Sequence, residues 1–137
     1  MEAHFKLSDE QFEKQFGNCS LDPAIFSHEA HLRLAWIHIK NAGVEKAIEN
    51  ICTQLPAFVK SVGAEGKYNK TLTIAAIYAV NHFMNKSDSN NFYAFIQEYP
   101  SLRVNFKRLM ACHYGVDIYN NELAKKEYLE PDLLPFT

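Results

Sequence analysis

The sequence predicts an all-α protein, a single compact bundle of about five to seven helices joined by short connections. Apolar residues recur with a helical period along most of the chain, and no segment alternates as a half-buried strand does. The chain has 137 residues, the usual size of one domain, and no repeat or linker divides it. We therefore expect one domain over residues 1–137.

The N-terminal half contains three predicted helices, over residues 8–17, 28–41 and 44–62. Ser8 and Gln11 form a capping-box pattern that opens the first helix, and Ser27 caps the second. Gly43 follows the second helix at the position where glycine commonly ends one. Pro56 lacks an amide donor, so we expect it to kink or split the third helix.

The C-terminal half contains four further predicted helices, over residues 71–84, 92–99, 101–115 and 120–130. Asn90 or Asn91 caps the second of these, and Pro100 stops it. Gly115 ends the long helix that follows.

Composition excludes several classes of function. The 14 basic and 16 acidic residues give a net charge of −2, which offers no basic excess for nucleic acid. No apolar run reaches the roughly 20 residues needed to cross a membrane, and the N-terminus is not signal-like, so we expect a cytoplasmic protein. The three cysteines are odd in number and lack C-x-x-C spacing, which indicates reduced, structural residues.

Three histidines of the second predicted helix form the first candidate site. His28, His31 and His38 fall within an arc of roughly 80°, which indicates an internal or groove-lining face. A separate polar arc is expected to face solvent; it comprises Glu29, Arg33 and Lys40. The segment "HEAHL" differs from the H-E-x-x-H zinc motif because its histidines are three residues apart, not four. His4 is expected to lie in a mobile N-terminus.

The fourth predicted helix has a narrow polar stripe of Thr71, Tyr78 and His82, within roughly 40°. In an up-down-up bundle this helix runs parallel to the second, which places Tyr68 and Asn69 near the first two histidines. We expect one cavity with His28 and His31 as the catalytic pair. Its expected ligand-binding residues are His38, Tyr68, Asn69, Thr71, Tyr78 and His82.

Two other interpretations of the histidines stay open. Buried histidines paired within a helical core are common, and a weak metal site is the second alternative. An i, i+3 pair supplies only two nitrogens, so we expect no stoichiometric metal. Helix N-termini beside Lys67 and Lys70 favour instead a small anionic or carbonyl-bearing ligand.

The blocks "FSHEAHLRLAW", "KYNKTLT" and "EPDLLPF" resemble a family of small, uncharacterised bacterial helical proteins. The resemblance covers most of the chain from Phe26 onward and implies a shared fold and pocket location. In that family the middle block usually has a histidine where this chain has Asn69. An amide oxygen is a poor zinc ligand and does not titrate, so the resemblance does not imply shared chemistry.

The leading functional hypothesis is a protein with a small-molecule pocket, either a binding protein or an enzyme, in which one histidine accepts a proton. The alternative is a regulatory or interaction module, in which "NNFYAFIQEYPSLRVNF" and "LEPDLLPF" form an apolar partner surface or a homodimer contact. No nucleophile elbow, phosphate loop or dinucleotide fingerprint is present, which argues against the common large enzyme classes.

Overall fold

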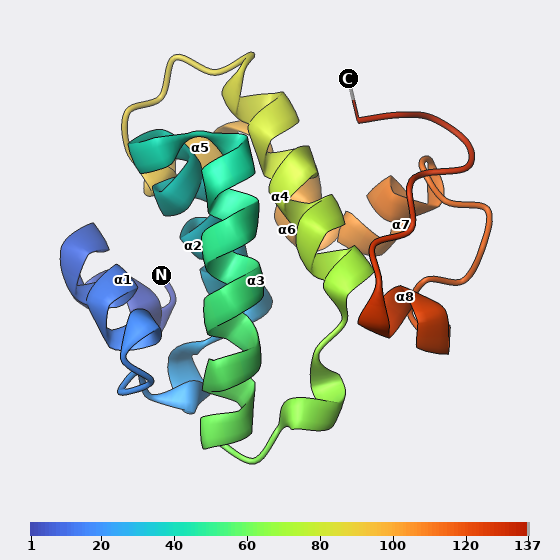
Figure 1. Ribbon diagram of the computed structural model, residues 1–137. Coiled ribbons are helices and arrows are strands. Elements are labelled where there is room, and N and C mark those ends of the chain that lie inside the picture. The colour runs from blue at the N-terminus through green and yellow to red at the C-terminus, as the bar shows by residue number, and fades with distance from the viewer. Residues whose placement is uncertain (137) are drawn as a thin grey trace. The chain divides into compact units, whose positions relative to one another are not determined.

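The computed structural model describes residues 1–136 and shows them as all-α, with no strand in that range (Figure 1). The fold class predicted from the sequence is therefore confirmed. The α-helices are α1 (Asp9–Gly17), α2 (His28–Ala42), α3 (Val44–Ser61), α4 (Lys70–Met84), α5 (Phe92–Glu98), α6 (Ser101–Val104), α7 (Phe106–Ala111) and α8 (Glu122–Lys126). Short 3-10 helices are η1 (Ala3–Lys6), η2 (Pro23–Ile25) and η3 (Glu65–Lys67).

Contacts between Cα atoms group the chain into two compact units, Met1–Tyr68 and a second that begins at Asn69. The first unit contains η1 to η3 and α1 to α3, and the second contains α4 to α8. The expectation of a single domain stays a prediction.

Local sequence signals set the helix boundaries in the first unit. Ser8 Oγ accepts from the Gln11 amide at 3.1 Å, and the Gln11 side chain accepts from the Ser8 amide at 2.9 Å, which confirms the capping box. Ser27 Oγ accepts from the Ala30 amide and so caps α2. Gly43, with φ of 87°, ends α2 in a conformation that other residues rarely adopt.

The second helix is the centre of the first unit. It packs against α3, and α1 contacts both helices. Apart from His31, every residue from Ala30 to Ile39 is buried, and Trp36 is among the largest fully buried side chains. Burying a large apolar side chain contributes roughly 1.5–3 kcal/mol, so this helix supplies much of the unit's core.

Pro56 does not split α3, which runs unbroken from Val44 to Ser61, so this part of the prediction was wrong. Ile51, Leu55 and Phe58, on both sides of the proline, are all buried. Their burial stabilises the continuous helix and offsets the roughly 3 kcal/mol that an internal proline costs a helix.

Two C-terminal helices differ from the sequence prediction. The helix expected over residues 101–115 is broken at Asn105, whose φ of −127° lies outside the helical region, so α6 and α7 are separate. Asparagine has low helix propensity, which explains why the chain leaves the helix there. The last helix, α8, is shorter than predicted because the backbone is extended from Glu127.

Buried polar groups on the first turn of α4 hold other segments of the second unit. Thr71 is fully buried; its hydroxyl donates to the Glu127 carbonyl at 2.7 Å and accepts from the Leu129 amide at 3.0 Å. Asn69 caps α4 by accepting from Leu72, and its amide group donates to the Ile118 carbonyl at 2.8 Å. These bonds fix non-helical backbone against a helix.

Residues 127–136, which we call the C-terminal tail, also bind the segment after α7. The Leu133 amide donates to the His113 carbonyl at 3.0 Å, and the Gly115 amide donates to Asp132 at 2.9 Å. The ring of Phe136 is buried and stacks on His113 with centroids 4.1 Å apart. The tail therefore packs within its own unit.

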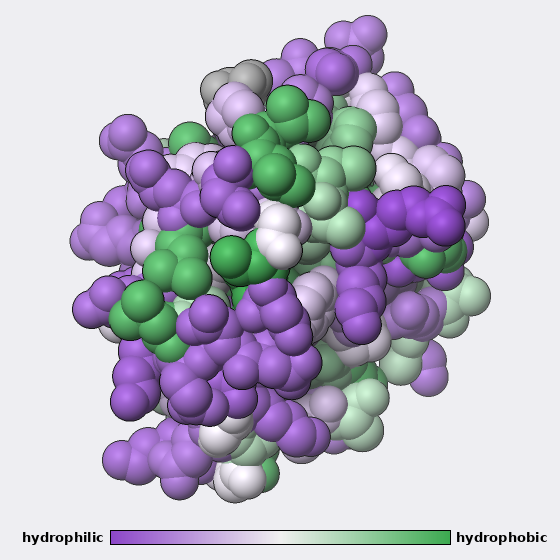
Figure 2. Space-filling view, turned by 90° about the vertical axis from the view of Figure 1, so that its right-hand side faces the viewer, coloured by the Kyte–Doolittle hydropathy of each residue, from purple (hydrophilic) through white to green (hydrophobic). Residues whose placement is uncertain are grey.

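No helix in the described residues is long and apolar enough to cross a membrane. Large apolar side chains of the second unit nevertheless reach the surface, and Figure 2 shows such residues among hydrophilic ones on one face. Leu133 and Leu134 of the C-terminal tail are 56% and 59% exposed.

We expect Thr71→Val to destabilise the protein by about 1–3 kcal/mol, because the isosteric valine leaves the part-buried Glu127 carbonyl and Leu129 amide without Thr71 as partner. Urea denaturation followed by circular dichroism measures the change. Thr53→Val, at an exposed position of α3, is the matched control. Equal stability of the two variants would contradict a structural role for Thr71.

Candidate functional site

The first turn of α2 presents two of the predicted histidines to solvent. His28 and His31 are both exposed and lie three residues apart. The His31 ring stacks on Phe26, with centroids 3.9 Å apart and planes tilted by 26°. Because Phe26 precedes the helix and His31 belongs to it, this stack fixes the orientation of the imidazole.

The surroundings of His31 hold its imidazole neutral. Desolvation by nearby protein atoms, with a smaller contribution from His28, lowers the pKa of His31 to about 4 although solvent reaches the side chain. A histidine with so low a pKa is a weak base near pH 7. His31 therefore suits hydrogen bonding to a ligand better than proton acceptance.

Glu29 and Arg33 are buried, which corrects the expectation that they face solvent; Lys40 is exposed as expected. Arg33 donates to the carbonyls of His4 at 2.6 Å and Leu7 at 2.8 Å. Its Nη2 also lies 2.9 Å from Asp9 Oδ1. A buried arginine needs such partners, and the N-terminal segment supplies them.

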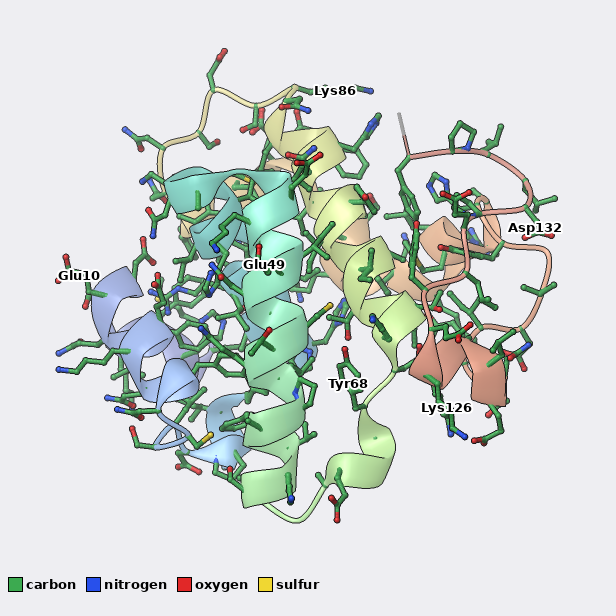
Figure 3. The ribbon with its side chains drawn as sticks, viewed as in Figure 1. Glu10, Glu49, Tyr68, Lys86, Lys126 and Asp132 are labelled. Carbon is green, nitrogen blue, oxygen red and sulfur yellow. The ribbon has the colours of Figure 1, made fainter. Side chains whose placement is uncertain are left out.

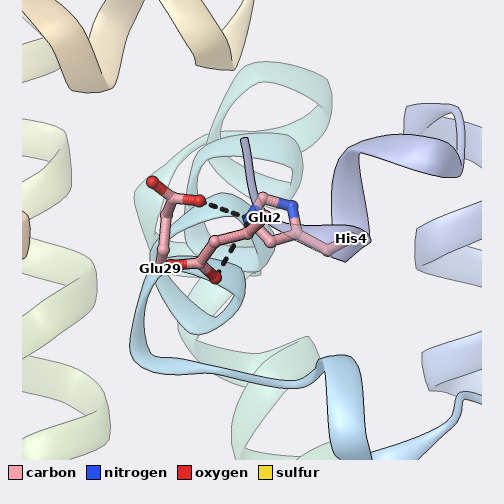
Figure 4. A group of neighbouring side chains, drawn as sticks. All are labelled: Glu2, His4 and Glu29. Atoms are coloured by element: carbon pink, nitrogen blue, oxygen red, sulfur yellow. Dashed lines mark hydrogen bonds and ion pairs between the residues drawn. The ribbon is translucent and has the colours of Figure 1, made fainter.

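His4 is fully buried, so the expectation that it lies in a mobile N-terminus was wrong. Its Nε2 lies 2.7 Å from Glu29 Oε2 and 3.8 Å from Glu2 Oε1. Figure 4 shows both carboxylates directed at the same nitrogen of the His4 imidazole; His4 belongs to η1 and Glu29 to α2. Ser27 Oγ donates to Glu2 in addition. We call Glu2, His4 and Glu29 the N-terminal triad.

Helical periodicity gives only a partial signal for the N-terminal triad. Glu29 and Arg33 are four residues apart and share one helix face, a spacing visible in the sequence. The segment that covers this face comes from more than 20 residues earlier in the chain. Periodicity within one helix cannot reveal that partner.

His38 belongs to the core instead of an open site. It is 4% exposed, its Nδ1 lies 3.4 Å from Asn50 Nδ2, and its Nε2 has no hydrogen-bond partner among the described residues. Burial lowers the pKa of His38, and Glu13 partly offsets that effect. His38 is therefore neutral near pH 7.

Tyr68 lies at the end of the first unit, beside α3. Figure 3 shows its side chain extending alongside that helix from the loop after η3. Burial raises the pKa of the Tyr68 hydroxyl, and a hydrogen bond with Cys52 raises it further. Tyr68 is thus a neutral hydroxyl near pH 7.

The other predicted ligand-binding residues belong to the second unit. The polar groups of Asn69 and Thr71 are bonded to its backbone. Tyr78 is half-buried and stacks on Phe136 with centroids 5.8 Å apart. His82 is half-buried against Phe83.

The eight predicted site residues thus fall into two groups. The first unit contains His28, His31, His38 and Tyr68, and the second contains Asn69, Thr71, Tyr78 and His82. Within the first unit, only His28 and His31 are shown to interact with each other, through their charges. A single cavity that unites all eight residues stays a prediction.

Comparison of the chain with protein-family models, curated proteins and solved structures gives no match. The resemblance to small bacterial helical proteins therefore stays a prediction.

Acidification should destabilise the first unit through His38. The folded-state pKa of His38 is below the value of 6.5 for a free histidine, so the unfolded chain binds more protons between the two values. The contribution of His38 to the free energy of unfolding is fully present above pH 6.5 and decreases as the pH drops below that value. Urea midpoints at pH 7.5 and 5.5, followed by Trp36 fluorescence, measure the loss.

His38→Gln cannot take up a proton at this position, so its urea midpoint should depend less on pH than that of the unmodified protein. An equal pH dependence of the two proteins would show that His38 does not cause the effect.

Proposed function

We propose that this protein binds a small anionic or carbonyl-bearing molecule at the first turn of α2, with His28 and His31 as its main contacts. The observation that carries the proposal is the environment of His31. The residue is exposed, and its ring is held in one orientation by the stack on Phe26. A polar group kept at the surface in a fixed orientation is a ready contact for a ligand.

The chemistry of the two histidines fits this ligand class. A neutral imidazole has one N–H donor and one acceptor nitrogen, and the donor can bond a carbonyl or carboxylate oxygen. The N-terminal end of a helix carries partial positive charge, which favours a negative group beside His28 and His31. Glu29 lies between them in sequence but is buried against His4, so its carboxylate is directed elsewhere.

This function requires binding and no proton transfer, which differs from the sequence hypothesis of a catalytic base. The assignment of Tyr68, whose hydroxyl bonds to Cys52, to this ligand remains a proposal. His38 does not take part because it is buried in the core. The assignments of Asn69, Thr71, Tyr78 and His82 to the same ligand remain proposals.

Nuclear magnetic resonance with pyruvate, a carbonyl-bearing anion, tests the site. We expect saturable shifts of the His28 and His31 ring signals as pyruvate is added. His31→Ala should weaken binding about tenfold, because it removes one hydrogen bond worth about 1.4 kcal/mol. Phe26→Ala should weaken it less, by releasing the ring without removing it.

Lys46→Ala, at an exposed position of α3, is the control and should leave the pyruvate affinity unchanged. Acetate and inorganic phosphate extend the test to anions without a ketone. Absence of saturable shifts with all three probes would refute the proposal, as would an unchanged affinity in His31→Ala.

An interaction module is the second candidate, and the exposed leucines of the C-terminal tail favour it. Leu133 and Leu134 project to solvent while hydrogen bonds hold their backbone, so they form a fixed apolar surface. A homodimer formed through this surface should dissociate in Leu133→Ser/Leu134→Ser. Light scattering over a range of concentrations measures the mass; a monomer throughout would exclude the homodimer.

A further inference from the structure

We propose that the N-terminal triad of Glu2, His4 and Glu29 is a binding site for a divalent transition-metal ion, Zn²⁺ foremost. One ligand atom from each residue, the imidazole nitrogen and two carboxylate oxygens, lies within 4.8 Å of the other two. The imidazole nitrogen is 2.7 Å from one oxygen and 3.8 Å from the other. The site lies beside the proposed ligand-binding turn but uses neither His28 nor His31.

These distances match the size of a metal site. Ligand atoms about 2.1 Å from a Zn²⁺ ion are roughly 3 to 3.5 Å apart when they share its coordination sphere. The two nitrogen–oxygen distances bracket that value, and the two carboxylate oxygens lie within 4.8 Å of each other, so movement of the flexible glutamate side chains brings all three ligand atoms to that spacing. Figure 4 shows the three side chains converging on one point from η1, α2 and the residue before η1.

The donor set selects the class of ion. One imidazole nitrogen with two carboxylate oxygens suits Zn²⁺ and Mn²⁺, whereas Mg²⁺ and Ca²⁺ prefer oxygen alone. Three protein ligands leave at least one position open for water. The Glu2 side chain is 42% exposed, which gives an ion and its water a route in, while His4 and Glu29 are buried.

The residues around the triad hold its ligands in place. Arg33 fixes the backbone of His4 through the 2.6 Å bond to its carbonyl, and Ser27 holds the Glu2 carboxylate. Arg33 Nη1 also lies 3.4 Å from His4 Nδ1, but its short bond is to the carbonyl. Metal binding at Nε2 replaces the 2.7 Å contact of that nitrogen with Glu29 and puts the ring proton on Nδ1, so the 3.4 Å contact with Arg33 Nη1 must lengthen while the short bond to the carbonyl stays. Arg33 is thus a positioning residue, not a ligand.

Isothermal titration of the untagged, EDTA-treated full chain with ZnCl₂, and separately with MnCl₂, tests the site. We expect one tight site per chain for Zn²⁺. Glu29→Gln and His4→Gln should weaken it at least about tenfold, since each loses one ligand. Because metal binding stabilises the folded state, Zn²⁺ should also raise the melting temperature of the unmodified protein but not of Glu29→Gln.

Glu29→Gln and His4→Gln replace buried residues and so can prevent folding. Glu2→Gln avoids this problem because Glu2 lies at the surface and contributes an exposed carboxylate. Its matched control is Glu10→Gln, an exposed glutamate on α1 that Figure 3 shows pointing away from the helix. Glu2→Gln should weaken Zn²⁺ binding and Glu10→Gln should not. The proposal is overturned if the unmodified chain binds no Zn²⁺, or if Glu2→Gln and Glu29→Gln bind it as tightly as the unmodified chain.

Failure of the metal site leaves the pyruvate test of His31 unaffected, and the reverse also holds, because the two experiments use different residues and probes.

Discussion

Backbone carbonyls and amides in the non-helical segments need hydrogen-bond partners, and the structure of both units depends on buried side chains that provide them. In the first unit, the guanidinium of Arg33 donates hydrogen bonds to two carbonyls of the N-terminal segment. In the second, the hydroxyl of Thr71 and the side-chain amide of Asn69 donate hydrogen bonds to carbonyls about 50 residues later in the chain. Arg33, Asn69 and Thr71 are buried, and each side chain is hydrogen-bonded to backbone, which offsets the cost of burying its polar group.

The sequence predicted the fold wherever local chemistry decides it. Ser8 and Ser27 cap the helices they were expected to cap, Asn91 begins α5, and Gly43 ends α2 with positive φ. Prediction failed where packing and local propensity disagree. The core holds α3 together through Pro56 despite the cost of an internal proline.

The candidate site was less predictable because helical periodicity gives the direction of a side chain around the helix axis but not what packs against it at that level of the axis. His31 and His38 share a helix face, but His31 lies on the first turn and His38 lies farther along the helix, beside Asn50 of α3. One is exposed and the other is buried. Position along the axis, which depends on tertiary packing, separates a surface group from a core residue. The same limit hid Glu29 and Arg33, whose partners come from residues 4–9.

The uneven distribution of aromatic residues gives each unit its own optical signal. Trp36, the only tryptophan, is buried in α2, whereas six of the seven tyrosines follow Asn69. Indole emission therefore reports on the first unit, and tyrosine absorbance reports mainly on the second. Coincident transitions of the two signals would show cooperative unfolding of the whole chain, and separate transitions would show two units that melt independently.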